Sequence, residues 1–160
     1  MKSDYVFFWG GCFSNWYPCK FTMGDVEFSS SEQAFMCEKA LFFEDEEADA
    51  KILATKDPRE QKAIGRTIKN FDAEKWSEVS KGIMYEVCKA KFTQNKHLLK
   101  ALLATEGKTL VEGSNQDSIW GIGLLESDPR AWNKETWLGT NLLGYTLTEL
   151  RDNIIKESKI

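Results

Sequence analysis

The feature that most constrains the fold is an apolar stripe within residues 73–94. Its members follow one another at intervals of three or four residues, which places them on one face of an α-helix. Asp72 stands directly before this segment and is a favourable N-cap residue. The sequence therefore predicts a long amphipathic helix that must bury one face against the rest of the chain. The stripe consists of Trp76, Val79, Ile83, Val87 and Ala90.

Helix signals also occur on both sides of this segment. Ser29 and Glu32 have the spacing of a capping box, which predicts a helix that continues to about residue 43. Asp57 followed by Pro58 marks the start of another helix, because proline fits the first helical position. We expect further helices over 46–55, between Asn95 and Gly107, and after Thr140 or Asn141.

Short β-strands are expected mainly near the N-terminus. Residues 5–9 are aromatic and β-branched, which favours a strand. Residues 21–23 and 26–28 flank Gly24-Asp25, and this Gly-first connection predicts a type II′ hairpin. Residues 109–112 and 118–120 are two more strand candidates, and 124–140 is expected to be irregular. Together these elements predict one α+β domain over 1–160, mostly helical with a small β-sheet.

Composition limits the chemistry. The chain has 160 residues, of which 42% are hydrophobic, so one well-filled core is expected. A net charge of -4 argues against a broadly basic nucleic-acid-binding protein. His97 is the single histidine, which excludes His-rich metal sites and makes a Ser-His-Asp triad improbable. We therefore expect neither a metal nor a cofactor.

The sequence also bears on cellular location. No run of about 18 apolar residues occurs, so no membrane partner is expected. The apolar run near the N-terminus is too short for a signal peptide, which predicts a cytoplasmic protein. Cysteines stand at positions 12, 19, 37 and 88 without a CxxC pair, and we expect them to be buried free thiols.

Three segments place polar residues among aromatic residues and glycines. The first contains Ser14 and Asn15, the second is the helix start at Glu32, and the third is Asp117 to Gly121. Each also has a structural interpretation. Glu32 can complete a capping box, Asp117 can cap a turn, and Asn15 can satisfy its own backbone. Trp76 and Trp120 can likewise be large core residues, so no single segment is specific.

Taken together, these segments resemble the YbiA/NADAR family over about residues 6–155. The resemblance implies the family's fold and hydrolysis of an N-glycosidic bond between ribose and a nitrogen base. The matching segments are Phe8-Trp9, Phe13-Ser14-Asn15-Trp16, Ser30-Ser31-Glu32-Gln33-Ala34-Phe35, Ile64-Gly65-Arg66, Trp76, Ala90-Lys91-Phe92, Leu110-Val111-Glu112, Asp117-Ser118-Ile119-Trp120-Gly121, Asn141-Leu142-Leu143-Gly144 and Glu149-Leu150-Arg151.

The resemblance also implies roles for individual residues. Glu32, Trp76, Asp117 and Trp120 match positions implicated in the family's activity, and Arg66 matches a basic position suited to phosphate. We expect Glu32 to act at the ribose and Asp117 to orient water or ribose hydroxyls, although either carboxylate could be the acid, base or nucleophile. The tryptophans would shape the pocket. Ser14 and Asn15 would hydrogen-bond the ligand, and Gly121 would allow its close approach.

Two departures from the family pattern concern specificity. Family members often carry His after the helix-start Glu, where this chain has Gln33, and residues 122–139 are longer than in compact members. The resemblance implies a small nucleotide-like substrate, a ribosylamino-pyrimidine phosphate of the riboflavin pathway. The alternatives are removal of ADP-ribose from guanine in nucleotides or DNA, and non-catalytic ADP-ribose binding. Lysines that could track a nucleic acid, Lys89, Lys91, Lys96 and Lys100, have the spacing of a solvated helix face.

Overall fold

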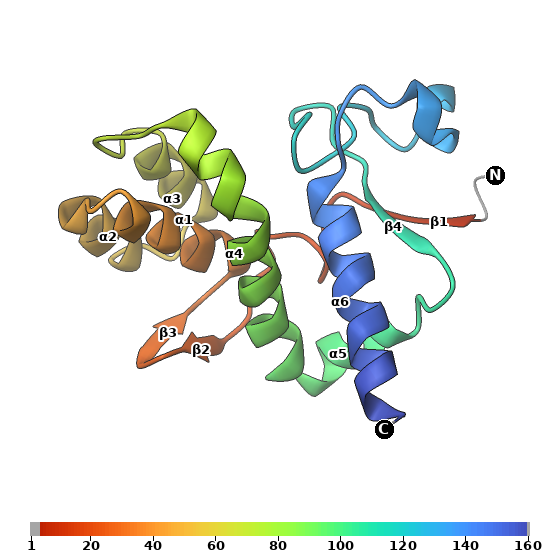
Figure 1. The fold of residues 1–160 in the computed structure, drawn as a ribbon, viewed down its shortest axis with the longest axis horizontal. Coiled ribbons are helices and arrows are strands. Elements are labelled where there is room, and N and C mark those ends of the chain that lie inside the picture. Colours follow the sequence, from red (N-terminus) through yellow and green to blue (C-terminus); the bar gives the residue numbers. More distant parts are fainter. Residues whose placement is uncertain (1–3, 160) are drawn as a thin grey trace. The chain divides into compact units, whose positions relative to one another are not determined.

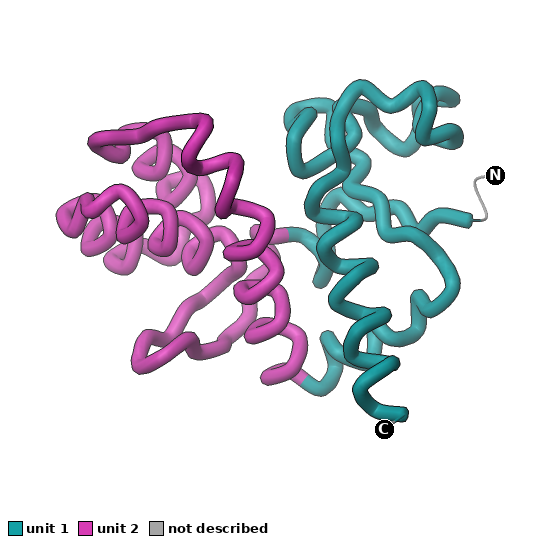
Figure 2. The backbone as a smooth tube through the Cα atoms, viewed as in Figure 1, with its two compact units in different colours: residues 1–14, 96–160 teal, residues 15–95 magenta. Residues whose placement is uncertain are grey.

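The computed structural model describes residues 4–159 and divides the chain into two compact units (Figure 2). Unit 1 combines the N-terminal residues up to Ser14 with the C-terminal part from Lys96 onward, and unit 2 holds Asn15–Asn95. Both contain helices and short strands, which confirms the predicted α+β class. The β content is divided between two two-stranded sheets, one in each unit.

Unit 2 is a hairpin followed by four helices (Figure 1). The hairpin joins antiparallel strands through Gly24-Asp25, as predicted, and Gly24 has the positive φ (61°) that this turn needs. Asp57 and Asp72 cap their helices by accepting hydrogen bonds from first-turn N–H groups, also as predicted. The elements are β2 (Phe21–Met23), β3 (Val26–Phe28), α1 (Ser31–Phe42), α2 (Glu46–Leu53), α3 (Pro58–Gly65) and α4 (Ala73–Thr93).

Unit 1 is built around two parallel strands that come from distant parts of the sequence. β1 (Tyr5–Phe8) pairs with β4 (Thr109–Glu112), and α6 (Leu142–Ser158) packs against β4 (Figure 1). The remaining elements are α5 (Lys96–Leu103) and two short 3-10 helices, η2 (Pro129–Trp132) and η3 (Lys134–Thr136). Residues 124–140 are otherwise irregular, as expected. Leu124 and Ala131 of this stretch form a small core with Ile122 and with Val111 of β4.

Two residues at the start of α6 fasten this helix to β4. Asn141 is the N-cap, as expected, but its side chain does not cap the helix. Its amide instead accepts from the Glu112 N–H (3.0 Å) and donates to the Leu110 carbonyl (3.1 Å). A Cβ on Gly144 would overlap that same carbonyl oxygen. The Asn-Leu-Leu-Gly segment therefore serves close packing of helix on strand.

Two expectations need correction. Residues 118–120 do not form a strand, because Asp117 captures their backbone N–H groups in a turn. Of the four cysteines, Cys37 and Cys88 are buried, whereas Cys12 and Cys19 are only half-buried. Burial raises the pKa of the Cys88 thiol to about 12, so this thiol is expected to be unreactive.

Candidate functional site

The start of α1 carries the first group of predicted site residues. The N-cap is Ser30, whose hydroxyl accepts from the Gln33 N–H (3.1 Å). The side-chain oxygen of Gln33 in turn accepts a hydrogen bond from the N–H of Ser29, which lies just before the helix (2.8 Å). The predicted capping pair of Ser29 and Glu32 is therefore wrong by one residue. Capping of α1 is performed by Ser30 and Gln33, and Glu32 is left out of it.

Gln33 also connects α1 to the end of α2. Its amide nitrogen donates to the carbonyls of Ile52 (3.2 Å) and Thr55 (3.0 Å), and the residue is buried. A buried amide with partners on both of its ends fixes the position of the helix start. The residue that stands where family members often carry His thus has a structural role in this chain.

Glu32 is buried in the first turn of α1, with 7% of its surface exposed. Its backbone N–H donates to the carbonyl of Asn15 (2.9 Å), so the structure brings these two predicted site residues together. Two polar atoms of the same region, Oδ1 of Asn15 and Oγ of Ser31, are buried without a hydrogen-bond partner among the described residues. The positive end of the helix dipole favours negative charge here, either on Glu32 or on a ligand.

Lys39, which the sequence reasoning missed, lies within electrostatic reach of both Glu32 and Arg66. It lies seven residues after Glu32, two turns along the same face of α1. Its ammonium donates to the Gly65 carbonyl (3.0 Å) and lies 4.6 Å from the centre of the Phe71 ring. Burial lowers the pKa of Lys39, the Glu32 carboxylate opposes this shift and the Arg66 guanidinium adds to it.

Arg66 is exposed at the C-terminal end of α3. Gly65 before it packs directly on α1, because a Cβ there would overlap the sulfur of Met36 and displace that side chain. The Ile-Gly-Arg segment thus brings α3 close to α1. It also places the Arg66 charge within electrostatic reach of Lys39.

Trp76 stands on the first turn of α4 and is half-buried. Its ring lies 5.2 Å from that of Phe35, 6.0 Å from that of Phe42 and 6.1 Å from that of Phe43, measured between centroids. Trp76 therefore packs α4 onto α1. This contact supports the structural interpretation of Trp76, and its half-exposed surface is all that remains for a ligand.

In unit 1 the predicted site residues occur in the loops that follow the two parallel strands. β1 leads into Ser14, and β4 leads into Asp117, Trp120 and Gly121. The carboxyl ends of parallel strands lie at the same edge, which is where ligands bind in many parallel sheets. Ser14 is buried and donates its N–H to the Gly11 carbonyl (3.0 Å). Ser14 and Asn15 are consecutive, and the boundary between the two units falls between them.

Asp117 has a clear structural duty. Its Oδ1 accepts hydrogen bonds from the N–H groups of Ile119 (2.9 Å) and Trp120 (2.8 Å), so the expected turn-capping interpretation is confirmed. Gly121 fits this turn because a Cβ there would lie 2.9 Å from the Asp117 carbonyl oxygen. That glycine therefore permits close approach of the backbone, where the sequence suggested close approach of a ligand.

Glu112 is a carboxylate at this edge to which the sequence reasoning gave no role. It is the last residue of β4 and is half-buried. A Cβ on Gly121 would lie 3.1 Å from its Oε2, so the Glu112 carboxylate lies beside the Asp117 turn. Its position in the Leu-Val-Glu segment, directly before a glycine, was the available signal.

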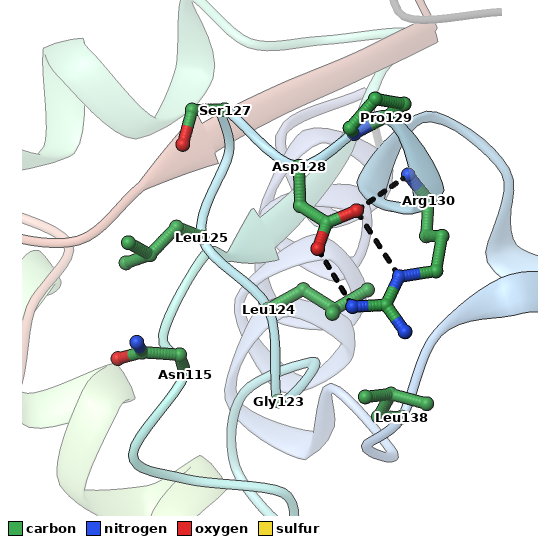
Figure 3. Close-up of a pocket in the computed structure, with 9 residues that line it drawn as sticks. All are labelled: Asn115, Gly123, Leu124, Leu125, Ser127, Asp128, Pro129, Arg130 and Leu138. Atoms are coloured by element: carbon green, nitrogen blue, oxygen red, sulfur yellow. Dashed lines mark hydrogen bonds and ion pairs between the residues drawn. The ribbon is translucent and has the colours of Figure 1, made fainter.

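The stretch 122–139 forms hollows in unit 1. One has a volume of about 410 Å³ and is lined by residues 123–125 and 127–130 together with Asn115 and Leu138 (Figure 3). Asp128 and Arg130 face each other at its rim, and two hydrogen bonds join the guanidinium to the carboxylate (3.1 and 2.8 Å). This ion pair lowers the pKa of Asp128 and raises that of Arg130.

One lysine of the predicted solvated track is wrongly assigned. Lys89, Lys96 and Lys100 are exposed, but Lys91 is 1% exposed. The Lys91 ammonium lies 5.0 Å from the centre of the Phe92 ring and 5.9 Å from that of Tyr17. Helical spacing alone could not separate this buried position from its exposed neighbours.

Comparison with known proteins assigns the family. The NADAR domain matches residues 7–155. The chain belongs to the NADAR domain family. The N-glycosidase R617 of Acanthamoeba polyphaga mimivirus is 37% identical over 95% of this chain and 98% of its own length. Protein irg-1 of Caenorhabditis elegans is 36% identical over 93% of this chain and 78% of its own length.

A solved structure shows the same fold. The NMR structure of the Escherichia coli protein YbiA matches with a TM-score of 0.80 at 28% identity, covering 99% of this chain and 89% of that one. Within residues 4–159, this NADAR chain has no helix with the length and apolarity needed to cross a bilayer. The same residues hold no group of three or more His, Cys, Asp or Glu side chains arranged for a metal ion.

Proposed function

We propose that this NADAR protein is an N-glycosidase that hydrolyses the ribose–base bond of a small nucleotide-like substrate. The observation that carries the proposal is the buried carboxylic acid residue Glu32 at the start of α1, a helix that is capped by other residues. Ser30 and Gln33 cap the helix, and Glu32 between them is a buried acidic residue in its first turn, where the helix dipole favours negative charge. Family membership and a relative named N-glycosidase support the reaction class.

The reaction needs a negative charge beside C1 of the ribose. Water adds to C1, the C–N bond breaks, and the base leaves with the bonding electron pair and a proton. The transition state resembles an oxocarbenium ion, which a carboxylate stabilises. We assign this role to Glu32. Its burial strengthens the electrostatic interaction with the developing positive charge, because little water screens it.

The other predicted residues take supporting roles in the proposal. Asp117 uses one oxygen for its turn, and we assign its second oxygen to a water molecule or a ribose hydroxyl. Trp120 and the exposed side of Trp76 would contact the flat parts of the substrate. Asn15 and Ser14 would hydrogen-bond the ligand, and the buried Oδ1 of Asn15 supports this assignment because it has no partner among residues 4–159.

The substrate we propose is a ribosylamino-pyrimidine phosphate of the riboflavin pathway. Arg66, with Lys39 nearby, would bind the phosphate, because a guanidinium donates two parallel hydrogen bonds to phosphate oxygens. The net charge of -4 favours a small substrate over a nucleic acid. We also propose a cytoplasmic location, on the sequence argument alone.

One assay tests both the activity and the substrate. The protein is incubated with a ribosylaminouracil phosphate and, separately, with ADP-ribosylated guanosine and ADP-ribosylated DNA, and released base and ADP-ribose are measured by mass spectrometry. We expect release of base from the first substrate. Release of ADP-ribose alone would replace the proposed substrate with ADP-ribosylated guanine. Tight binding of ADP-ribose without any product would contradict the enzymatic role.

A further inference from the structure

A second hollow in unit 1 lies at the end of β1. It encloses about 500 Å³ and is lined mostly by apolar surface. This volume is within the range of small-molecule sites. Its lining residues are Phe8, Trp9, Gly113, Leu125, Glu126 and Ser127.

Trp9 is the unusual member of this lining. It is 71% exposed, the highest exposure of any large hydrophobic side chain within residues 4–159. The backbone beneath it is nevertheless well held, because Phe8 pairs with Glu112 and its carbonyl accepts from the Gly113 N–H (2.8 Å). Trp9 thus presents a flat aromatic ring in the lining of the hollow from a fixed backbone position. The indole therefore provides a stacking surface.

Two polar residues also line the hollow. Glu126 and Ser127 share this lining with Trp9 and Leu125, and both polar residues are exposed. Backbone forms part of the floor, since a Cβ on Gly113 would lie 3.3 Å from the Glu126 nitrogen. A mostly apolar lining that includes a tryptophan and a glutamate suits a planar heterocycle with an exocyclic amino group, because the ring can stack on the indole and a carboxylate can accept a hydrogen bond from the amine.

We propose that this hollow binds the amino-bearing base of the substrate, with Trp9 stacking on the ring and Glu126 accepting from the exocyclic amine. The inference rests on the proposed function. Location supports it, because Gly113 follows Glu112 directly and the Glu112 carboxylate lies beside the turn formed by Asp117 and Gly121. The base would thus bind at the strand edge that also holds the candidate catalytic carboxylate of unit 1.

Binding of nucleosides tests the site without requiring turnover. Guanosine and cytidine carry the amino group, whereas inosine and uridine lack it and serve as matched ligands. The indole N–H signal of Trp9 is followed by NMR and assigned with Trp9→Phe. We expect guanosine and cytidine to shift this signal and Trp9→Ala to weaken their binding about 5- to 150-fold. Trp9→Phe should retain most of the affinity, and Trp132→Ala is the control for an exposed tryptophan outside the hollow.

Two further outcomes make the test decisive. Glu126→Ala should reduce the preference for guanosine over inosine while leaving inosine binding unchanged. Equal binding of guanosine by wild type and Trp9→Ala would overturn the inference. A wild-type dimer in sedimentation that Trp9→Ala dissociates would also overturn it, because the Trp9 ring would then contact a second copy of the chain. A wild-type protein whose Trp9 signal responds to amino-bearing bases but that hydrolyses no substrate supports the subsite and contradicts only the proposed function.

Discussion

The two predicted catalytic carboxylates occupy very different local structures. Glu32 lies in a helix start whose capping is carried out by its neighbours Ser30 and Gln33. Asp117 is itself the capping group of its turn, with Oδ1 bound to two backbone N–H groups. The fold therefore requires Asp117 whether or not it is catalytic, whereas the capping of α1 does not depend on Glu32, to which the proposed function assigns the role at the ribose. Mutations can separate these two kinds of carboxylate.

The largest effect is expected at Asp117, where structure and activity coincide. Asp117→Ala should lower kcat about 100-fold or more and also lower the free energy of unfolding by about 0.5–2 kcal/mol, the usual loss when a capping side chain is removed. Asp117→Asn retains an oxygen that can cap the turn, so it should restore stability without restoring activity. Turnover assays and urea denaturation measure the two quantities. Full activity in Asp117→Asn would remove this carboxylate from the chemistry.

A smaller effect, on stability, is expected at Gln33. Gln33→Ala leaves the buried carbonyl of Ile52 and the half-buried carbonyl of Thr55 without this donor and should lower the free energy of unfolding by about 1–3 kcal/mol. Gln94 is a matched control, because its amide also bonds both backbone groups of Thr22 but in an exposed position. If urea denaturation shows that Gln94→Ala lowers the free energy of unfolding as much as Gln33→Ala does, the buried hydrogen bonds of Gln33 do not specifically stabilise the start of α1.

The smallest effect concerns Lys39 and pH. Burial holds the pKa of Lys39 below its ordinary value of 10.5, so the unfolded chain binds this proton more tightly than the folded one. Stability should therefore rise as pH increases through the interval between the folded-state pKa and 10.5. Lys39→Met should abolish this rise, which thermal denaturation at several alkaline pH values would show. An unchanged pH profile in Lys39→Met would contradict the assignment.

Local signals in the sequence were sufficient for much of the fold. Asp57 and Asp72 cap their helices because each side chain reaches N–H groups only two or three residues away. The hairpin around Gly24 follows from one residue that tolerates positive φ. Such elements need no information from distant parts of the chain, so the sequence predicts them well.

Features that depend on distant contacts were harder to predict. Three serines in a row could all cap α1, and the choice of Ser30 depends on Gln33, which is held by carbonyls at the end of α2. The pairing of β1 with β4 joins residues about 100 positions apart. In α4 the buried face includes the polar residues Ser80 and Lys91. The apolar stripe predicted from residue type is therefore displaced by about one residue from the face that is buried.

The candidate site was predicted from resemblance more than from residue type. The motifs identified Glu32 and Asp117, but they could not show that Gln33 carries the capping role or that Gly121 serves its own backbone. Lys39, Glu112 and Trp9 were passed over as site residues because a lysine, a strand-end glutamate and an N-terminal tryptophan have ordinary structural explanations. They are considered as site residues because of their neighbours in the fold. Lys39 lies in electrostatic reach of Arg66, Glu112 lies beside the Asp117 turn, and Trp9 lines a hollow.

The most direct test of this account is a paired measurement on α1. Glu32→Gln and Glu38→Gln remove one carboxylate each from the same helix, and each variant is assayed for turnover of a ribosylaminouracil phosphate and for its free energy of unfolding. We predict that Glu32→Gln loses at least about 100-fold in kcat with unfolding close to that of wild type, and that Glu38→Gln keeps its activity. A Glu32→Gln variant that unfolds easily but hydrolyses normally once folded would show that Glu32 serves the fold and would contradict the account.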